Sequence, residues 1–310
     1  MRTVKLLRLR HHEIDKKRWD EGIARSTHPL VYADSWYLDI VSPQWEAVVS
    51  DDYSILWPLT LNRKYKLPML MQPMFTQQLG VFSSLPLDKQ MVTQIYKANP
   101  YPILSLQSHA QIKWPAARQV TAKQNAVLPL QKDYDSLQKA FRKGRKHSVK
   151  KALKNPGMSI SHASAGAFVA FTQQHNTYHL AEKHLQLLQK LITSALAQDH
   201  GFILSAREEA EGPLAMAFFL RKYQRITHLS GHSSSGGLAK DGMSLIINQV
   251  IKDYAGSDYL LDFEGSDLKG VASFYRSFGA EIECYQSYRH PWFANWQRIR
   301  QGLGKIMGDF

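Results

Sequence analysis

The chain has 310 residues, of which 44% are hydrophobic, 21% charged and 11% aromatic. A chain of this length and composition can bury a sizeable core without disulfides, which excludes the disordered and collagenous classes. Its single cysteine, Cys284, cannot pair internally or supply a thiolate zinc site by itself, so the sequence favours a reducing compartment. The 39 Lys and Arg residues outnumber the 26 Asp and Glu residues, giving a net charge of +13 that attracts phosphate-bearing cofactors, nucleic acid or anionic lipid.

The start of the chain carries charged residues every few positions across 1–12, where a signal peptide needs an unbroken apolar stretch. No apolar run approaches the roughly 20 residues of a membrane span. We therefore expect no transmembrane segment and a cytoplasmic location. The 13 histidines include His11 and His12 but no spaced set of His and Cys, and Gly-x-Ser-x-Gly is absent, so we expect neither a metal site nor a serine hydrolase.

The first half of the chain predicts an α/β module. In chain order the expected elements are a strand at 3–9, helices at 14–24 and 33–40, strands at 45–50, 54–62 and 67–73, a helix at 87–98, and strands at 103–107 and 126–130.

A strongly basic helix is predicted next, over 134–155, and the Pro-Gly pair at 156–157 ends it. Nine Lys and Arg residues lie between positions 132 and 154, against two Asp residues. Apolar residues four apart give this helix a stripe that can dock while the charges project. We expect the charged face to bind phosphate groups of a substrate, the alternative being a solvated face. The candidate substrate-binding residues are Arg142, Arg145 and Lys146.

The second half predicts similar elements in a similar order. They are a strand at 158–161, helices at 165–175 and 183–198, strands at 202–207, 213–221 and 226–233, a loop at 234–242, a helix at 243–255, a strand at 259–263, a helix at 269–278 and a strand at 280–285. The three strands between 202 and 233 indicate an antiparallel meander. We therefore predict an N-terminal module at 1–133, a basic connecting helix at 134–155 and a C-terminal module at 156–310.

The order of elements and one motif resemble the acyl-CoA N-acyltransferase (GNAT) superfamily. The stretch from Asp262 to Ala280 is similar to the fifth strand and fourth helix of that family, whose helix commonly ends in Tyr, three residues and Gly, here Tyr275 and Gly279. Two tandem modules joined by a basic helix resemble a narrower group, the FemABX-like aminoacyltransferases. The resemblance implies an α/β fold of two tandem GNAT-like modules, each a mixed, mainly antiparallel sheet flanked by helices. It leaves the donor open between acyl-CoA and aminoacyl-tRNA.

A Gly-rich segment before the predicted helix at 243–255 is the candidate donor site. The resemblance places the donor loop of the family here, and backbone N–H groups at a helix N-terminus can hold the pyrophosphate of coenzyme A or a nucleic-acid phosphate. An ordinary strand-to-helix connection is the alternative. The candidate donor-binding residues are Ser234, Ser235, Gly236, Gly237, Lys240, Asp241, Gly242, Met243 and Ser244.

Three residues near the predicted strand at 259–263 are the catalytic candidates. The resemblance implies that Tyr275 points between the splayed fourth and fifth strands and protonates the departing thiolate; the alternative is a core Tyr with a satisfied hydroxyl. Asp262 and Glu264 alternate, so we expect both on one face, where their repulsion raises one pKa and lets a carboxylate orient or deprotonate an amine. Alternatively, one of them caps the turn at 265–266.

Four polar residues are candidate contacts to the acceptor. His232 ends the predicted strand at 226–233 and is a further base candidate, although a lone His in a strand is more often structural. Gln72, Gln77 and Gln78 follow an apolar strand and can donate to a polar acceptor between the modules. A loop stabilised by its own amides is the alternative.

Taken with these features, the resemblance implies an N-acyltransferase that passes an acyl group from acyl-CoA to a primary amine. The amine attacks directly, and a backbone N–H of the fourth strand polarises the carbonyl of the tetrahedral intermediate. One alternative is a FemABX-type transferase that uses aminoacyl-tRNA, bound through the basic helix, and acts on the amine of a cell-wall precursor. The other is a nucleic-acid-binding or scaffolding protein that keeps the fold without catalysis.

Overall fold

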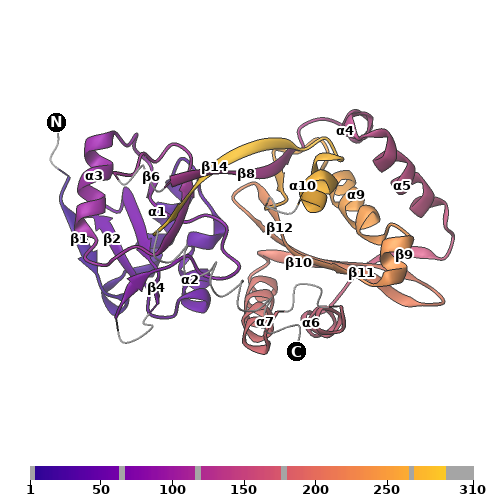
Figure 1. Cartoon of the computed structure of the whole chain (residues 1–310), viewed down its shortest axis with the longest axis horizontal. Helices are drawn as coiled ribbons and strands as arrows, with labels where there is room; N and C mark the ends of the chain where they lie inside the picture. The colour runs from indigo at the N-terminus through magenta and orange to yellow at the C-terminus, as the bar shows by residue number, and fades with distance from the viewer. Residues whose placement is uncertain (1–3, 63–66, 116–119, 176–179, 265–268, 291–310) are drawn as a thin grey trace, which may run out of the picture. The chain divides into compact units, whose positions relative to one another are not determined.

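The computed structural model describes residues 4–62, 67–115, 120–175, 180–264 and 269–290 (Figure 1). The chain divides into two compact units. Unit 1 takes residues 1–123 and 284–310, and unit 2 takes residues 124–283. Two long strands, β8 (Val120–Pro129) and β14 (Glu281–Arg289), pass from one unit to the other.

Unit 1 contains an antiparallel sheet in the order β1-β2-β3-β6, with helices on both faces. Successive side chains of β3 point to opposite faces. Trp57 packs into a buried cluster with Val92 and Ile95 of α3, whereas Leu56 lies against Gly22 of α1. The elements are β1 (Leu6–Leu9), α1 (Lys16–Arg25), α2 (Ser35–Val41), β2 (Glu46–Ser50), β3 (Ile55–Leu59), β6 (Phe82–Ser83) and α3 (Lys89–Ala98).

Two helices of unit 1 begin where the sequence supplies a capping carboxylate. Asp15 accepts a 3.1 Å hydrogen bond from a backbone N–H in the first turn of α1, and Asp88 accepts one of 2.7 Å in the first turn of α3. Each bond satisfies an amide group that a helix start leaves without an intrahelical partner. The other elements of the unit are η1 (His11–Glu13), η2 (Val31–Ala33), β4 (Leu61–Asn62), β5 (Met69–Leu70) and β7 (Ser105–His109), which pairs antiparallel with β14.

Unit 2 contains a mixed sheet in the order β8-β13-β12-β11-β10-β9. Its neighbouring strands are antiparallel except for β12 and β13, which are parallel, so the predicted antiparallel meander is confirmed. The strands are β9 (Met158–His162), β10 (Gly201–Glu208), β11 (Gly212–Lys222), β12 (Arg225–Ser233) and β13 (Leu260–Asp262). The helices are α4 (Tyr134–Ala140), α5 (Lys143–Lys154), α6 (Ala165–Gln174), α7 (Glu182–Ala197), α8 (Ser235–Ala239), α9 (Gly242–Tyr254) and α10 (Lys269–Arg276).

Both faces of the unit 2 sheet are covered by helices (Figure 1). On one face, Phe219 of β11 joins a buried cluster that includes Ile246 and Val250 of α9. On the other face, the preceding residue Phe218 meets Phe168 of α6, with the ring centroids 6.4 Å apart. A strand buried on both faces has an unbroken apolar sequence, which is why the run at 213–221 predicts β11 correctly.

Two features of the fold differ from the sequence prediction. The segment at 134–155 forms two helices rather than one, because Phe141 turns into the core between them and the next backbone N–H, that of Arg142, donates to Ser277 O at 2.9 Å. The strand expected at 126–130 lies in β8 and pairs with β13 of unit 2, whereas β14 pairs with β7 of unit 1. The boundaries of the compact units, after residues 123 and 283, therefore differ from those of the predicted segments 1–133, 134–155 and 156–310.

Candidate active site

The parallel strands β12 and β13 of unit 2 separate after three residue pairs, of which Thr227 opposite Asp262 is the last. β13 stays with β8 beyond this point, since the backbone N–H of Phe263 donates to Ala126 O at 2.9 Å. A bulge in β12, with Leu229 as the extra residue, accompanies the separation. Bulges re-aim strand residues, and here the bulge lies where β12 loses its neighbour. The pairing of the two strands thus ends here, and we call the place between their separating ends the opening.

Tyr275 of α10 lies between the separating strands. Its ring stacks on Phe263, just beyond the end of β13, with the centroids 4.7 Å apart. Its hydroxyl oxygen is 3.4 Å from Nδ1 of His228 on β12. The catalytic role that the resemblance implies for Tyr275 stays a prediction. A phenol here can give a proton to a leaving group that enters the opening.

His228 is a buried residue of this opening that sequence reasoning does not find. Its ring stacks on Phe219 and meets Tyr275 edge-on, with centroid distances of 5.1 and 5.9 Å. Its Nε2 is buried and has no hydrogen-bond partner among the described residues. Gly231 makes room for this nitrogen, since a Cβ at that position would lie 2.5 Å from it. An isolated Gly inside a strand indicates close approach of another group, and it is the one sequence signal for His228.

Burial gives His228 a pH-dependent effect on stability. It lowers the pKa of His228 to about 4 from the ordinary value of 6.5, so the folded state binds this proton more weakly than the unfolded state does. The contribution of neutral His228 to the unfolding free energy is therefore complete above pH 6.5, and it is lost as the pH falls toward 4. Between pH 7 and pH 5 we expect the wild type to lose about 2 kcal/mol more unfolding free energy than His228→Gln. Urea unfolding of both proteins at the two pH values measures the difference, and equal losses would show that another group titrates.

The predicted carboxylate pair, Asp262 and Glu264, does not share one face of a strand. β13 ends at Asp262, and Glu264 has a φ of +58°, in the left-handed region, so the alternation stops before it. The backbone N–H of Glu264 donates to Asp262 Oδ1 at 2.8 Å, which is a turn-capping bond. The turn residues at 265–266 lie outside the described residues. The premise that placed both carboxylates on one face was therefore wrong.

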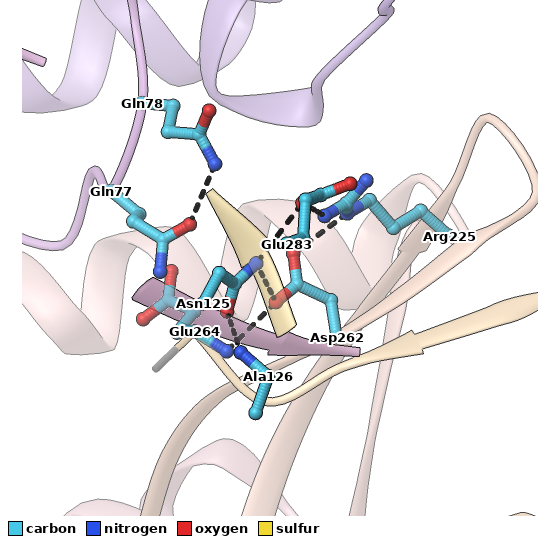
Figure 2. Close-up of polar contacts among 8 residues, drawn as sticks. All are labelled: Gln77, Gln78, Asn125, Ala126, Arg225, Asp262, Glu264 and Glu283. Carbon is cyan, nitrogen blue, oxygen red and sulfur yellow. Dashed lines mark hydrogen bonds and ion pairs between the residues drawn. The ribbon is translucent and has the colours of Figure 1, made fainter. Parts of the chain in front are cut away.

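Asp262 belongs to a buried ion-pair network (Figure 2). Its Oδ2 is 2.6 Å from Nε of Arg225, whose Nη2 is 2.5 Å from Oε2 of Glu283. The side-chain amide of Asn125 donates to Asp262 at 2.9 Å and to Glu283 at 3.3 Å. Burial lowers the pKa of Arg225, but the two carboxylates outweigh it and hold that pKa above its ordinary value. These bonds use both oxygens of Asp262, so the geometry favours a structural role that ties β13 to β12 and β8.

The Gly-rich segment, predicted as a loop over 234–242, contains the short helix α8. Ser234 caps it, with Oγ accepting a 3.0 Å hydrogen bond from the backbone N–H of Gly237. Gly237 lies so close to β11 that a Cβ would be 1.9 Å from Leu214 O, and glycine is required there. Capping thus explains Ser234, and close packing explains Gly237. Donor binding by Ser234, Ser235, Gly236 and Gly237 stays a prediction.

Helix α9 begins directly after α8. The first three residues of α9, Gly242 to Ser244, carry backbone N–H groups that have no intrahelical acceptor, whereas Leu245 N bonds to Asp241 O at 3.1 Å. Arg145 of α5 reaches the same turn and donates from Nη1 to Ser244 Oγ. A guanidinium therefore lies beside the start of a helix, and both guanidinium groups and helix N-termini can bind phosphate.

Lys240 is not positioned as a free cation for this phosphate site. Its Nζ pairs with the carboxylates of Glu208 and Glu211, the latter at 2.6 Å. These two partners raise the pKa of Lys240. The ion pairs instead tie the α8 segment to the turn between β10 and β11.

The three predicted substrate contacts of the basic segment, Arg142, Arg145 and Lys146, differ in their exposure. Arg142 and Lys146 are exposed. Arg145 instead lies over the ring of Phe274 at 4.3 Å and donates from Nε to Ser277 Oγ at 2.9 Å. Burial lowers the pKa of Arg145, while nearby Asp241 raises it. The expectation that Arg145 projects with the other charges was wrong, because it lies on the side of α5 that packs on unit 2.

Of the four predicted acceptor contacts, His232, Gln77 and Gln78 are buried and Gln72 is half-buried. His232 is 4% exposed, packs edge-on to Phe168 of α6, and has Nε2 3.3 Å from Ser230 Oγ. Burial lowers the pKa of His232. His232 thus lies on the α6 side of the sheet, opposite His228. A contact between His232 and the acceptor stays a prediction.

In unit 1, the side-chain amide of Gln72 donates to Thr76 O at 2.9 Å and accepts from the backbone N–H of Gln107 at 3.0 Å. Gln78 donates to the side-chain oxygen of Gln77 at 2.9 Å (Figure 2). The loop is thus stabilised by its own amides, as the alternative interpretation expected for Gln72. Gln77 and Gln78 as substrate contacts stay predictions.

Across the described ranges, no group of three or more His, Cys, Asp and Glu side chains is close enough to hold a metal ion. In the same part of the chain, every helix falls short of the length and apolar character that crossing a bilayer requires.

Comparisons with known proteins identify the fold. No family model and no curated protein matches the chain. The structure is similar to FemX, with a TM-score of 0.66 over 91% of this chain and 96% of that chain at 11% identity. It is also similar to a conserved protein of unknown function from Bacteroides thetaiotaomicron, with a TM-score of 0.57 over 93% and 100% at 9% identity, and to L-PGS from Bacillus licheniformis, with a TM-score of 0.53 over 94% and 97% at 10% identity. The predicted fold class is confirmed: the chain has the two-module, GNAT-like fold that FemX shares.

Proposed function

We propose that the chain is an N-acyltransferase that passes an acyl group from acyl-CoA to a primary amine, with unit 2 as the donor-binding unit. One observation carries the proposal: Tyr275 lies between the strands β12 and β13, where they separate in a GNAT-like fold. A tyrosine hydroxyl beside the separating strands suits a thioester that must lose a thiolate.

The proposed donor lies with its phosphates at the start of α9 and its acyl group in the opening. The backbone N–H groups of Gly242, Met243 and Ser244, together with Arg145, face the phosphates. β12 connects the two places, since it lines the opening and leads through α8 into α9. Three of the nine predicted donor-binding residues, Gly242, Met243 and Ser244, are thereby proposed for the donor, and a donor contact of Asp241 stays a prediction.

The proposed reaction needs one attack and one proton transfer. The amine nitrogen bonds to the acyl carbon, a backbone N–H of β12 beyond Thr227 stabilises the oxyanion, and the carbon–sulfur bond then breaks. The Tyr275 hydroxyl protonates the departing sulfur, and the proton that the amine nitrogen loses returns to the phenolate. The products are an amide and free coenzyme A, and the enzyme is unchanged.

A second candidate donor is aminoacyl-tRNA, with a cell-wall precursor amine as the acceptor. It is favoured by the run of exposed cations on α5 and by the fold that the chain shares with FemX. The ester oxygen of the tRNA ribose would then leave in place of the thiolate, and Tyr275 would protonate it.

Ligand-dependent stability distinguishes these donors. Acetyl-CoA at 100 times its dissociation constant is expected to raise the unfolding free energy by about 2.7 kcal/mol, because it binds only the folded state. Pantetheine has the thiol but lacks the nucleotide and pyrophosphate, so it is the matched control and is expected to give a much smaller rise at the same concentration. Stabilisation by tRNA with none by acetyl-CoA would replace the first donor by the second. Binding of either donor without any transfer to amines would point to the inactive, scaffolding alternative.

A further inference from the structure

The exposed side of α5 combines positive charge with an unshielded apolar side chain. Four lysines, Lys143, Lys146, Lys150 and Lys154, follow each other at spacings of three and four residues, so they lie along one side of the helix. All four are exposed, and Ser136 to Lys154 contains no carboxylate. We call this surface, with Leu153 beside it, the α5 face.

Leu153 is 58% exposed although it lies one residue from the buried Ala152. It is three residues after Lys150, so it borders the row of lysines. The helix is anchored on its opposite side by Val149 and Ala152, which are 1% and 2% exposed. The orientation of α5 is therefore fixed by its packing on unit 2, and the lysines and Leu153 stay at the surface.

A second exposed leucine lies near the same helix. Leu238 of α8 is 73% exposed. Lys151 of α5 donates from Nζ to the backbone oxygen of the next residue, Ala239, at 3.2 Å, and so joins the two helices. The surface around α5 therefore offers aliphatic side chains as well as cations.

From these observations we propose that the α5 face binds the surface of an anionic phospholipid bilayer, with Leu153 entering the headgroup region between lysines that contact lipid phosphates. Lysine side chains near an anionic bilayer each add to the affinity, and aliphatic side chains gain by leaving water at the interface. The proposal goes beyond acyl transfer and does not depend on it, since membrane binding needs neither donor nor acceptor.

The leucine favours lipid over RNA as the partner. Proteins that hold single-stranded nucleic acid use aromatic rings on which bases stack, and duplex RNA is held through phosphate and ribose contacts. The segments at 142–154 and 235–239 contain no Phe, Tyr or Trp. An exposed aliphatic side chain adds nothing to phosphate contacts but stabilises a protein at a bilayer surface.

Vesicle co-sedimentation of the full chain tests the proposal. We use large unilamellar vesicles of phosphatidylcholine alone and with 30% phosphatidylglycerol, and we expect binding to the second kind that weakens as salt increases. Replacing Lys143, Lys146 and Lys150 together by Gln is expected to lower the affinity on the order of a hundredfold, at about fivefold per lysine. Leu153→Asn is expected to lower it on the order of tenfold. All four positions are exposed, so thermal unfolding is expected to be unchanged.

Matched controls separate the α5 face from net charge and general exposure. The triple variant Lys89→Gln, Lys97→Gln and Lys183→Gln removes the same charge from exposed positions elsewhere, and Leu67→Asn removes a leucine that is 64% exposed in unit 1. Both are expected to bind vesicles like the wild type. The proposal is overturned if anionic vesicles are not bound, or if the control triple weakens binding as much as the α5 triple. It is also overturned if the α5 triple abolishes tRNA binding while Leu153→Asn leaves vesicle binding unchanged, because the face would then serve RNA.

Discussion

Tyr275→Phe is expected to lower the rate of acyl transfer by roughly 10²–10⁴-fold while donor affinity changes little. The variant keeps the aromatic ring, which stacks on Phe263, and removes only the hydroxyl that lies 3.4 Å from His228 Nδ1. The departing sulfur must then leave as an unprotonated thiolate, and the barrier to its departure rises. Single-turnover transfer from saturating donor, beside a donor-binding titration on the same variant, separates the chemical step from binding.

A second tyrosine in unit 2 provides the matched control. Tyr134 of α4 donates its hydroxyl to Asn248 Oδ1 at 2.9 Å, and it lies outside the opening between β12 and β13. Tyr134→Phe therefore removes one hydrogen-bonded hydroxyl and is expected to keep the wild-type transfer rate. Wild-type transfer by Tyr275→Phe would leave Tyr275 as a core residue. Loss of donor binding together with transfer would show a structural role instead.

Most elements could be predicted from the sequence because their periodicity is local. The helix expected at 183–198 is α7 (Glu182–Ala197), and its buried leucines recur at helical spacing. Pairing between distant segments could not be predicted in this way. β8 and β14 each have an ordinary strand pattern, and nothing in that pattern tells which sheet they join. The partner strand is decided by packing across the whole chain. The predicted module boundaries, after residues 133 and 155, therefore differ from those of the compact units, after residues 123 and 283.

Some residues of the candidate site could be predicted from the sequence, and others could not. Tyr275 was found through a motif, since the helix that carries it ends in a recognisable Tyr and Gly279. The carboxylates were misjudged because a positive φ at a residue other than glycine, as at Glu264, leaves no mark in the sequence. His228 has no motif, because a strand that contains a His has the same pattern whether that His is structural or functional. Its relation to Tyr275 depends on how α10 lies on the sheet.

Arg225→Met is expected to lower the unfolding free energy by roughly 3–5 kcal/mol, because it leaves the carboxylate of Asp262 buried without its cation. The side chain of Asp262 is 1% exposed, and that of Arg225 is 16% exposed. The pair joins β12 to β13 next to the last residue pair before the strands separate, so its loss is also expected to weaken donor binding. Urea unfolding of unliganded protein at pH 7 measures the change, with the slope checked for two-state behaviour.

Arg221→Met is the control for this prediction, since Arg221 also lies in the sheet of unit 2 and pairs with a carboxylate. Its partner, Asp199, is 87% exposed, and an exposed pair of this kind contributes about 0–1 kcal/mol. Replacing Arg225 and Asp262 together by Met is expected to recover most of the loss, because no buried charge of the pair then remains. A loss of less than about 1 kcal/mol for Arg225→Met would show that water or Asn125 compensates Asp262. A double variant no more stable than the single one would place the cost in packing rather than in the unpaired charge.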